Sequence, residues 1–141
     1  MSRKYVIASH AHFAAGIYES LCLLAGERDD VYILNAFVDG NDDIASAAVE
    51  LVDSLPCTDD VVVCTDLFGG SVNNEFTKLM LSRPNVYLMS NMNLPLLLTL
   101  FFADAEEDTD ALLRKLAHDD SLHPVYCNDA VSGVDTEDED F

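Results

Sequence analysis

Basic residues are scarce in this chain. Seven Lys and Arg residues stand against 26 Asp and Glu residues over 141 positions, which gives a formal net charge of −19. A surface of this sign repels nucleic acid and anionic membranes and favours partners that present a basic face. We therefore expect no nucleic-acid binding.

Long apolar runs are also missing. The longest mainly apolar stretch, residues 94–103, is far shorter than the roughly 20 residues that span a bilayer. No apolar region typical of a signal peptide precedes the first predicted strand. We expect a soluble, cytoplasmic protein.

Metal-ligand spacings of cysteine are absent as well. The four cysteines, at positions 22, 57, 64 and 127, form no CxxC pair. Three of them lie in apolar surroundings that are typical of reduced core thiols. We interpret the cysteines as structural and expect no bound metal.

Strand-like and helix-like patterns alternate through the rest of the chain, half of which is apolar. This alternation predicts right-handed crossovers and a doubly wound α/β fold, with a mostly parallel sheet and helices on both faces. A last, shorter strand would lie at a sheet edge, either antiparallel or paired with another subunit. The predicted strands cover residues 4–9, 31–38, 61–65, 86–89 and 122–127, and the predicted helices cover 13–25, 44–55, 72–82, a segment starting at 93–95, and 108–118.

The predicted domain ends near residue 128. Residues 1–128 contain all of the predicted strands and helices, and we assign them to one α/β domain. Residues 129–141 form an acidic tail that is too charged and too poor in apolar residues to fold alone.

A histidine and an aspartate follow two of the predicted strands. His10 ends the first strand and Asp66 comes directly after the third. The carboxyl ends of parallel strands share one edge, where open α/β sheets bind ligands. An imidazole beside a helix N-terminus, with a carboxylate on one ring nitrogen, suits a nucleophilic or phosphate-accepting role. His10 and Asp66 are therefore the candidate catalytic pair.

The residues after Asp66 add a phosphate-binding pattern. Gly69 and Gly70 let the backbone come close to a ligand, and Ser71 can cap the following helix. Backbone N–H groups at a helix start bind phosphate or an oxyanion. Gly70 and Ser71 are therefore the candidate phosphate-binding residues.

Three segments carry a resemblance to a known family. Residues 6–17, 65–74 and 91–95 resemble, in order and spacing, the EIIA domains of the mannose/fructose/sorbose family of the bacterial phosphoenolpyruvate-dependent sugar phosphotransferase system (PTS). The similarity runs from about residue 3 to about residue 127. Ala11 stands where the family usually has glycine, and Val72 where proline is frequent.

The resemblance implies a phosphoryl carrier of sugar uptake. Such a protein accepts phosphate from phospho-HPr on the histidine that matches His10, and the aspartate that matches Asp66 holds the other ring nitrogen. It then passes the phosphate to an EIIB component, without a cofactor, and meets the membrane only indirectly through the EIIC/EIID sugar permease. The family also implies a homodimer, in some members with an exchanged last strand.

Other interpretations compete with this one. The phosphotransferase subunit of dihydroxyacetone kinase carries a similar histidine, although the segment from Asp66 to Ser71 favours the sugar branch. A regulatory α/β module that does not transfer phosphate is a second alternative. His10 and His12, together with Asp66, resemble zinc ligands of a hydrolase, but a His-x-His pair alone is a weak signal.

Overall fold

The computed structural model describes residues 2–135, and side chains through residue 131. Within these residues, four strands form one parallel sheet in the order β2-β1-β3-β4. The predicted doubly wound α/β fold is thereby confirmed. The strands are β1 (Arg3–His10), β2 (Val31–Ala36), β3 (Asp60–Thr65) and β4 (Val86–Met89).

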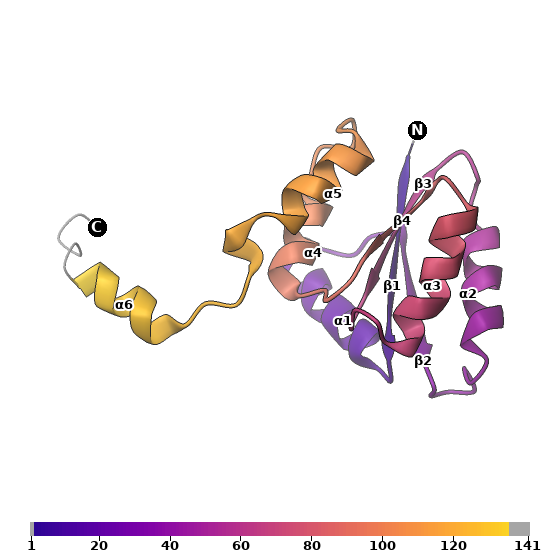
Figure 1. The fold of residues 1–141 in the computed structure, drawn as a ribbon, viewed down its shortest axis with the longest axis horizontal. Helices are drawn as coiled ribbons and strands as arrows, with labels where there is room; N and C mark the ends of the chain where they lie inside the picture. The colour runs from indigo at the N-terminus through magenta and orange to yellow at the C-terminus, as the bar shows by residue number, and fades with distance from the viewer. Residues whose placement is uncertain (1, 136–141) are drawn as a thin grey trace.

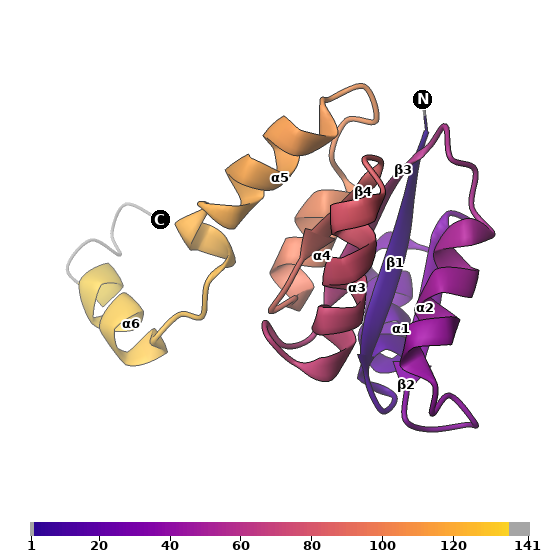
Figure 2. The same cartoon turned by 45° about the vertical axis from the view of Figure 1, so that its right-hand side comes forward.

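Helices cover both faces of this sheet (Figures 1 and 2). One face packs against α2 (Ile44–Asp53) and α3 (Ser71–Ser82), and the other against α1 (Phe13–Ala25), α4 (Leu94–Phe101) and α5 (Thr109–Ala117). The short 3-10 helix η1 (Asp120–Leu122) follows α5, and α6 (Cys127–Asp135) comes last.

Alternation along β1 divides the core into two layers. Tyr5 and Ile7 are buried with residues of α1, α4 and α5, whereas Val6 and Ala8 are buried with residues of α2 and α3. A strand covered on both faces has to be apolar at nearly every position. This explains why the predicted strands look like continuous hydrophobic runs.

Several helix boundaries follow from capping residues that the sequence displays. The side chain of Asn93 accepts a hydrogen bond from the Leu96 N–H at 2.8 Å, and Pro95 lies in the first turn of α4. Asp43 caps α2 in the same way. Gly26 ends α1 with a φ of 86°, a conformation that glycine adopts without strain.

The predicted last strand is absent from the described chain. Leu122 ends η1 and is buried in the core, and the Asn93 side-chain amide donates a hydrogen bond to its carbonyl at 2.8 Å. Residues 123–126 then run away from the sheet without regular structure (Figures 1 and 2). Because Leu122 is anchored beside α4, the chain leaves the body instead of turning back along β4. No described strand pairs with the outer side of β4.

The acidic tail predicted for residues 129–141 begins inside a helix. Helix α6 crosses the boundary drawn at residue 128 and continues to Asp135. The remainder of the predicted tail, residues 136–141, lies outside the described residues. The division into a domain and a tail at residue 128 stays a prediction.

Two further expectations concern the cysteines and the membrane. Within the described chain Cys64 is buried, Cys22 is half-buried, and Cys57 and Cys127 are exposed, so the expectation of three core thiols is wrong.

None of the helices between residues 2 and 135 has both the length and the apolar character that crossing a bilayer demands.

Candidate active site

The candidate site lies where the sheet changes its winding direction. β1 and β3 are neighbours, but the helix after β1 covers one face of the sheet and the helix after β3 covers the other. The loops that leave these two strands therefore diverge at the carboxyl edge, which is where open α/β sheets bind ligands. His10 ends β1 and Asp66 directly follows β3, so both lie at this edge.

Asp66 holds His10 at two points. One carboxylate oxygen, Oδ2, lies 2.9 Å from the His10 main-chain nitrogen and 2.9 Å from Nδ1 of its ring. The other oxygen, Oδ1, accepts a hydrogen bond from the Leu67 N–H at 3.0 Å. A carboxylate can only accept, so it places the ring proton of neutral His10 on Nδ1. The lone pair is then on Nε2.

Ser71 occupies the Nε2 side of the ring. Its hydroxyl lies 3.2 Å from Nε2 and can donate to the lone pair there. The sequence predicts that Ser71 caps α3, but Gly70 is the capping residue and Ser71 is the first residue of the helix. Because Ser71 does not cap the helix, its hydroxyl is directed to His10 instead of to the backbone of α3.

Gly70 provides space beside the imidazole. A Cβ atom at this position would lie 3.3 Å from His10 Cε1 and 3.3 Å from the Leu67 carbonyl oxygen. The Gly70 N–H donates to that same carbonyl at 3.1 Å, so it is already used within the turn. The Ser71 N–H makes no hydrogen bond with the described part of the chain. The turn thus offers two donors at Ser71 and open space at Gly70, and phosphate binding by these residues stays a prediction.

Strained backbone gathers at this edge of the sheet. Ala11, Phe37, Asp39 and Asn91 are the non-glycine residues with positive φ between positions 2 and 135, and all follow the carboxyl ends of strands. Such conformations cost about 1–3 kcal/mol each and cluster at functional sites. The left-handed φ of 51° at Ala11 also explains why glycine suits this position.

Sequence reasoning missed two residues of this site. The ring of Phe37 lies against the imidazole of His10, with 5.6 Å between ring centroids. The side-chain carbonyl of Asn91 accepts a hydrogen bond from the Phe68 N–H at 2.9 Å and so ties the loop after β4 to the loop after β3. No local pattern marks Phe37, whereas asparagine is a residue type that tolerates positive φ.

The metal interpretation of His12 finds no support. His12 Nε2 lies 2.6 Å from Asp39 Oδ2, and both side chains are largely exposed. Across the described residues, no three His, Cys, Asp or Glu side chains gather in a way that could hold a metal ion. His12 is instead part of the link between the loops after β1 and β2.

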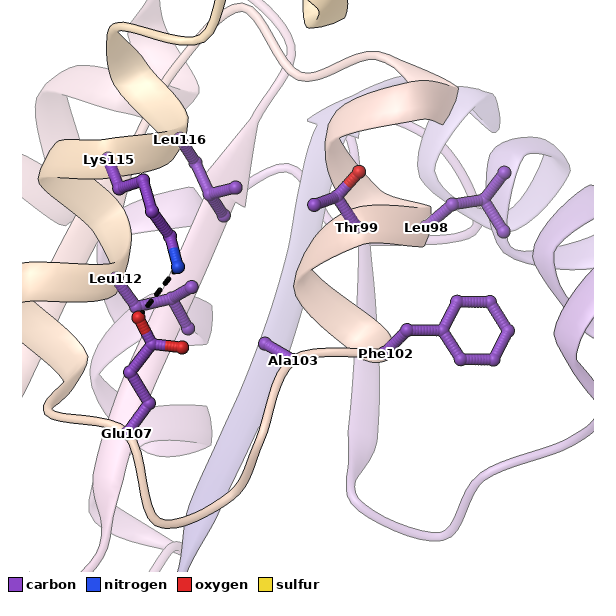
Figure 3. A pocket seen from close by; sticks show the side chains of 8 residues that line it. All are labelled: Leu98, Thr99, Phe102, Ala103, Glu107, Leu112, Lys115 and Leu116. Carbon is purple, nitrogen blue, oxygen red and sulfur yellow. Dashed lines mark hydrogen bonds and ion pairs between the residues drawn. The ribbon is translucent and has the colours of Figure 1, made fainter.

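Two hollows of the surface are lined by residues other than His10. One of about 420 Å³ lies between α4 and α5, with apolar walls and a Lys115–Glu107 ion pair at its rim (Figure 3). Another of about 810 Å³ runs beside β4 and reaches Phe68 and Asn91. The His10 side chain is 39% exposed and lines neither of them. An imidazole in such an exposed place suits contact with another protein better than catalysis on an enclosed small molecule.

Comparison with known proteins identifies relatives that match most of the chain. A family model described as the PTS system fructose IIA component (EIIA-man) matches residues 4–117. A crystal structure from Klebsiella pneumoniae, provisionally named a permease of the phosphoenolpyruvate-dependent sugar PTS, is 38% identical and superimposes with a TM-score of 0.86, covering 93% of this chain and 95% of that chain.

Two other structures are more distant. The PTS IIA protein associated with the fucose utilization operon of Streptococcus pneumoniae is 26% identical, with a TM-score of 0.79 over 93% of this chain and 97% of that chain. The mannose/sorbose-specific IIA subunit from Enterococcus faecalis is 22% identical, with a TM-score of 0.73 over 83% and 88%, and shows the shared fold.

Proposed function

Because the chain belongs to the family of PTS fructose IIA components, we propose that it is a phosphoryl carrier that accepts phosphate from phospho-HPr on His10 and donates it to an EIIB component. The observation that carries this proposal is the placement of the His10 ring between Asp66 at Nδ1 and Ser71 at Nε2. No cofactor takes part, because the imidazole itself is the nucleophile.

The proposed transfer is an in-line displacement at phosphorus. The Nε2 lone pair of neutral His10 attacks the phosphorus, and the bond between phosphorus and the donor breaks. The proton on Nδ1 remains hydrogen bonded to Asp66, whose negative charge balances the phosphorylated ring. The hydroxyl and N–H of Ser71 would then donate to phosphoryl oxygens, which come close because Gly70 has no side chain. Transfer to EIIB reverses these steps.

The surroundings of His10 fit a protein partner. Phe37, Leu67 and Phe68 are exposed apolar residues in the loops after β2 and β3, at the same edge of the sheet as His10. An apolar patch bordered by polar groups is typical of a protein-binding surface. The net charge of −19 favours partners with a basic face. The proposed partners HPr and EIIB place the protein in the cytoplasm, with an indirect link to the membrane through the EIIC/EIID permease.

A homodimer with an exchanged C-terminal segment is part of this proposal. β4 offers a free strand edge within the described fold, and the hollow of about 810 Å³ lies beside it. Val125 and Tyr126, in the extended segment that leaves the body, are largely exposed. An unpaired edge readily accepts a strand from another chain. Leu122, His123 and Pro124 line the hollow in their own chain, so we expect the segment around Val125 and Tyr126 of one copy to occupy the hollow of the other.

The dimer is tested by light scattering coupled to gel filtration. The double variant Val125→Asp and Tyr126→Asp should convert the dimer to a monomer, because two charges would enter an apolar groove. Leu81→Asp alters an apolar residue on α3 that is also largely exposed, and it should leave the dimer intact. A wild-type protein that is monomeric at micromolar concentration would contradict the dimer.

The phosphoryl transfer is tested by incubation with phosphoenolpyruvate, the general PTS enzyme and HPr, followed by intact mass. The wild type should gain one acid-labile phosphoryl group, and His10→Asn should gain none. Transfer of that group to a cognate EIIB separates a carrier from a regulatory module that only senses phosphorylation. An unlabelled wild type would overturn the proposal.

A further inference from the structure

Phe37 combines features that core packing does not explain. Its backbone is left-handed, with a φ of 68°, a conformation that is a rare outlier for a bulky side chain. Its side chain is not buried in return, because Phe37 is 45% exposed. A strained residue at a ligand edge of the fold points to a role in the site.

The loop around Phe37 is built to keep this conformation. The Phe37 N–H donates to the Asn41 carbonyl at 2.8 Å, and the Asn41 N–H donates to the Val38 carbonyl at 2.9 Å. The Asn41 side-chain amide donates to the Asn35 carbonyl at 3.1 Å, which ties the loop to the end of β2. The His12–Asp39 pair links the same loop to the start of α1. The turn is therefore closed on itself and attached at both sides.

What the loop presents to the site is the aromatic ring. The ring of Phe37 lies against the His10 imidazole with 5.6 Å between centroids and 38° between planes, within the range of favourable aromatic pairs. The imidazole is thus hydrogen bonded to Asp66 at Nδ1, lies beside the Ser71 hydroxyl at Nε2, and has the tilted ring of Phe37 next to it.

We propose that Phe37 is a positioning residue of phosphoryl transfer, held by its strained turn against His10 so that Nε2 keeps the orientation needed for in-line attack. This inference rests on the proposed function, because it concerns the same imidazole. Phe37 would act by restricting the orientation of the imidazole. A ring that is contacted at both nitrogens and lies beside a fixed aromatic side chain samples fewer unproductive orientations. Reaction rates fall steeply when the reacting atoms are misaligned.

The alternative role for Phe37 is simple contact with the partner protein. A small donor separates the two roles, because phosphoramidate can deliver a phosphoryl group to histidine without any docking surface. Phe37→Ala should be phosphorylated about tenfold more slowly than the wild type by phosphoramidate. With phospho-HPr as donor, kcat should fall while KM stays unchanged.

Three variants make the test specific. Phe37→Tyr keeps the ring and should retain the wild-type rate. Phe37→Gly removes the ring but also relieves the left-handed strain, so it should be as slow as Phe37→Ala while its melting temperature is not lowered. Phe102→Ala removes an exposed phenylalanine at the C-terminal end of α4, where it lines the hollow beside α5 (Figure 3), and should react at the wild-type rate.

An NMR measurement tests the contact without any phosphoryl transfer. Cross-relaxation between the ring protons of Phe37 and those of His10 should be observed in the unphosphorylated wild type. A wild-type rate in Phe37→Ala with phosphoramidate, or a defect confined to KM for phospho-HPr, would overturn the positioning role. An unlabelled wild type with both donors would instead remove the proposed function itself, and the two failures are thus distinguishable.

Discussion

Asp66 receives both the main-chain N–H and the ring Nδ1–H of His10 on a single carboxylate oxygen, each at 2.9 Å. The two bonds fix the ring relative to its own backbone. The main-chain N–H and the ring Nδ1–H share one acceptor, so rotation about the Cα–Cβ and Cβ–Cγ bonds would break one of the two hydrogen bonds. Asp66 is only 12% exposed, so water competes little for this acceptor. The orientation of the imidazole is therefore determined by a residue 56 positions away in the chain.

Replacement of Asp66 should slow phosphorylation of His10. In Asp66→Asn the amide offers an NH2 group as well as a carbonyl, so the proton is no longer confined to Nδ1 and the negative charge is lost. We expect a decrease on the order of 100-fold in the rate of labelling by phospho-HPr, measured by intact mass over time. Asp53→Asn, which removes an exposed carboxylate paired with Arg83, serves as control. Equal rates in the two variants would exclude Asp66 from the mechanism.

A methyl group at position 70 should disturb His10 without unfolding the protein. The Cβ of Gly70→Ala would lie 3.3 Å from His10 Cε1, while the φ of −72° suits alanine. We expect labelling to slow by about tenfold, because the ring has to move by a few tenths of an ångström. Gly16→Ala is the matched control, since a Cβ there meets no atom within 4 Å. That control should label normally, and an unaffected Gly70→Ala would show that the space at Gly70 is not needed.

Ala11→Gly should stabilise the fold. Alanine at a φ of 51° carries a steric cost that glycine avoids, and we expect a gain of about 0.5–1 kcal/mol in the free energy of unfolding. Ala45→Gly, at an exposed position in α2, should instead destabilise by up to about 1 kcal/mol, because helical glycine is unfavourable. Urea denaturation of both variants would show whether the free energy of unfolding rises in Ala11→Gly and falls in Ala45→Gly. Destabilisation by Ala11→Gly would mean that residue 11 is not left-handed in solution.

The cysteines should differ sharply in reactivity. Burial raises the pKa of the Cys64 thiol to about 12, so almost no thiolate forms at pH 8 and reagents cannot reach it. Iodoacetamide should label Cys57 and Cys127 in the folded protein and Cys64 only after denaturation, as peptide mass mapping would reveal. Rapid labelling of Cys64 under native conditions would contradict its burial beneath α1 and α4.

Local patterns were sufficient to predict most of the elements. The predicted strand at residues 86–89 agrees with β4, and the caps at Asn93 and Gly26 lie at the expected helix ends. Each of these features depends on residues that are close in sequence. The predicted strand at 122–127 is wrong because no local pattern reveals that Leu122 is buried and held by Asn93, and these contacts direct the chain away from the free edge of β4.

The sequence by itself determined the fold class and the candidate pair of His10 and Asp66, because parallel strands with crossover helices bring their carboxyl ends to one edge. Only the tertiary structure decided how that pair is completed. The Ser71 hydroxyl facing Nε2 and the Phe37 ring against the imidazole depend on loops separated by tens of residues. The left-handed backbone of Phe37 is imposed by hydrogen bonds within the folded loop, because phenylalanine by itself does not favour this conformation.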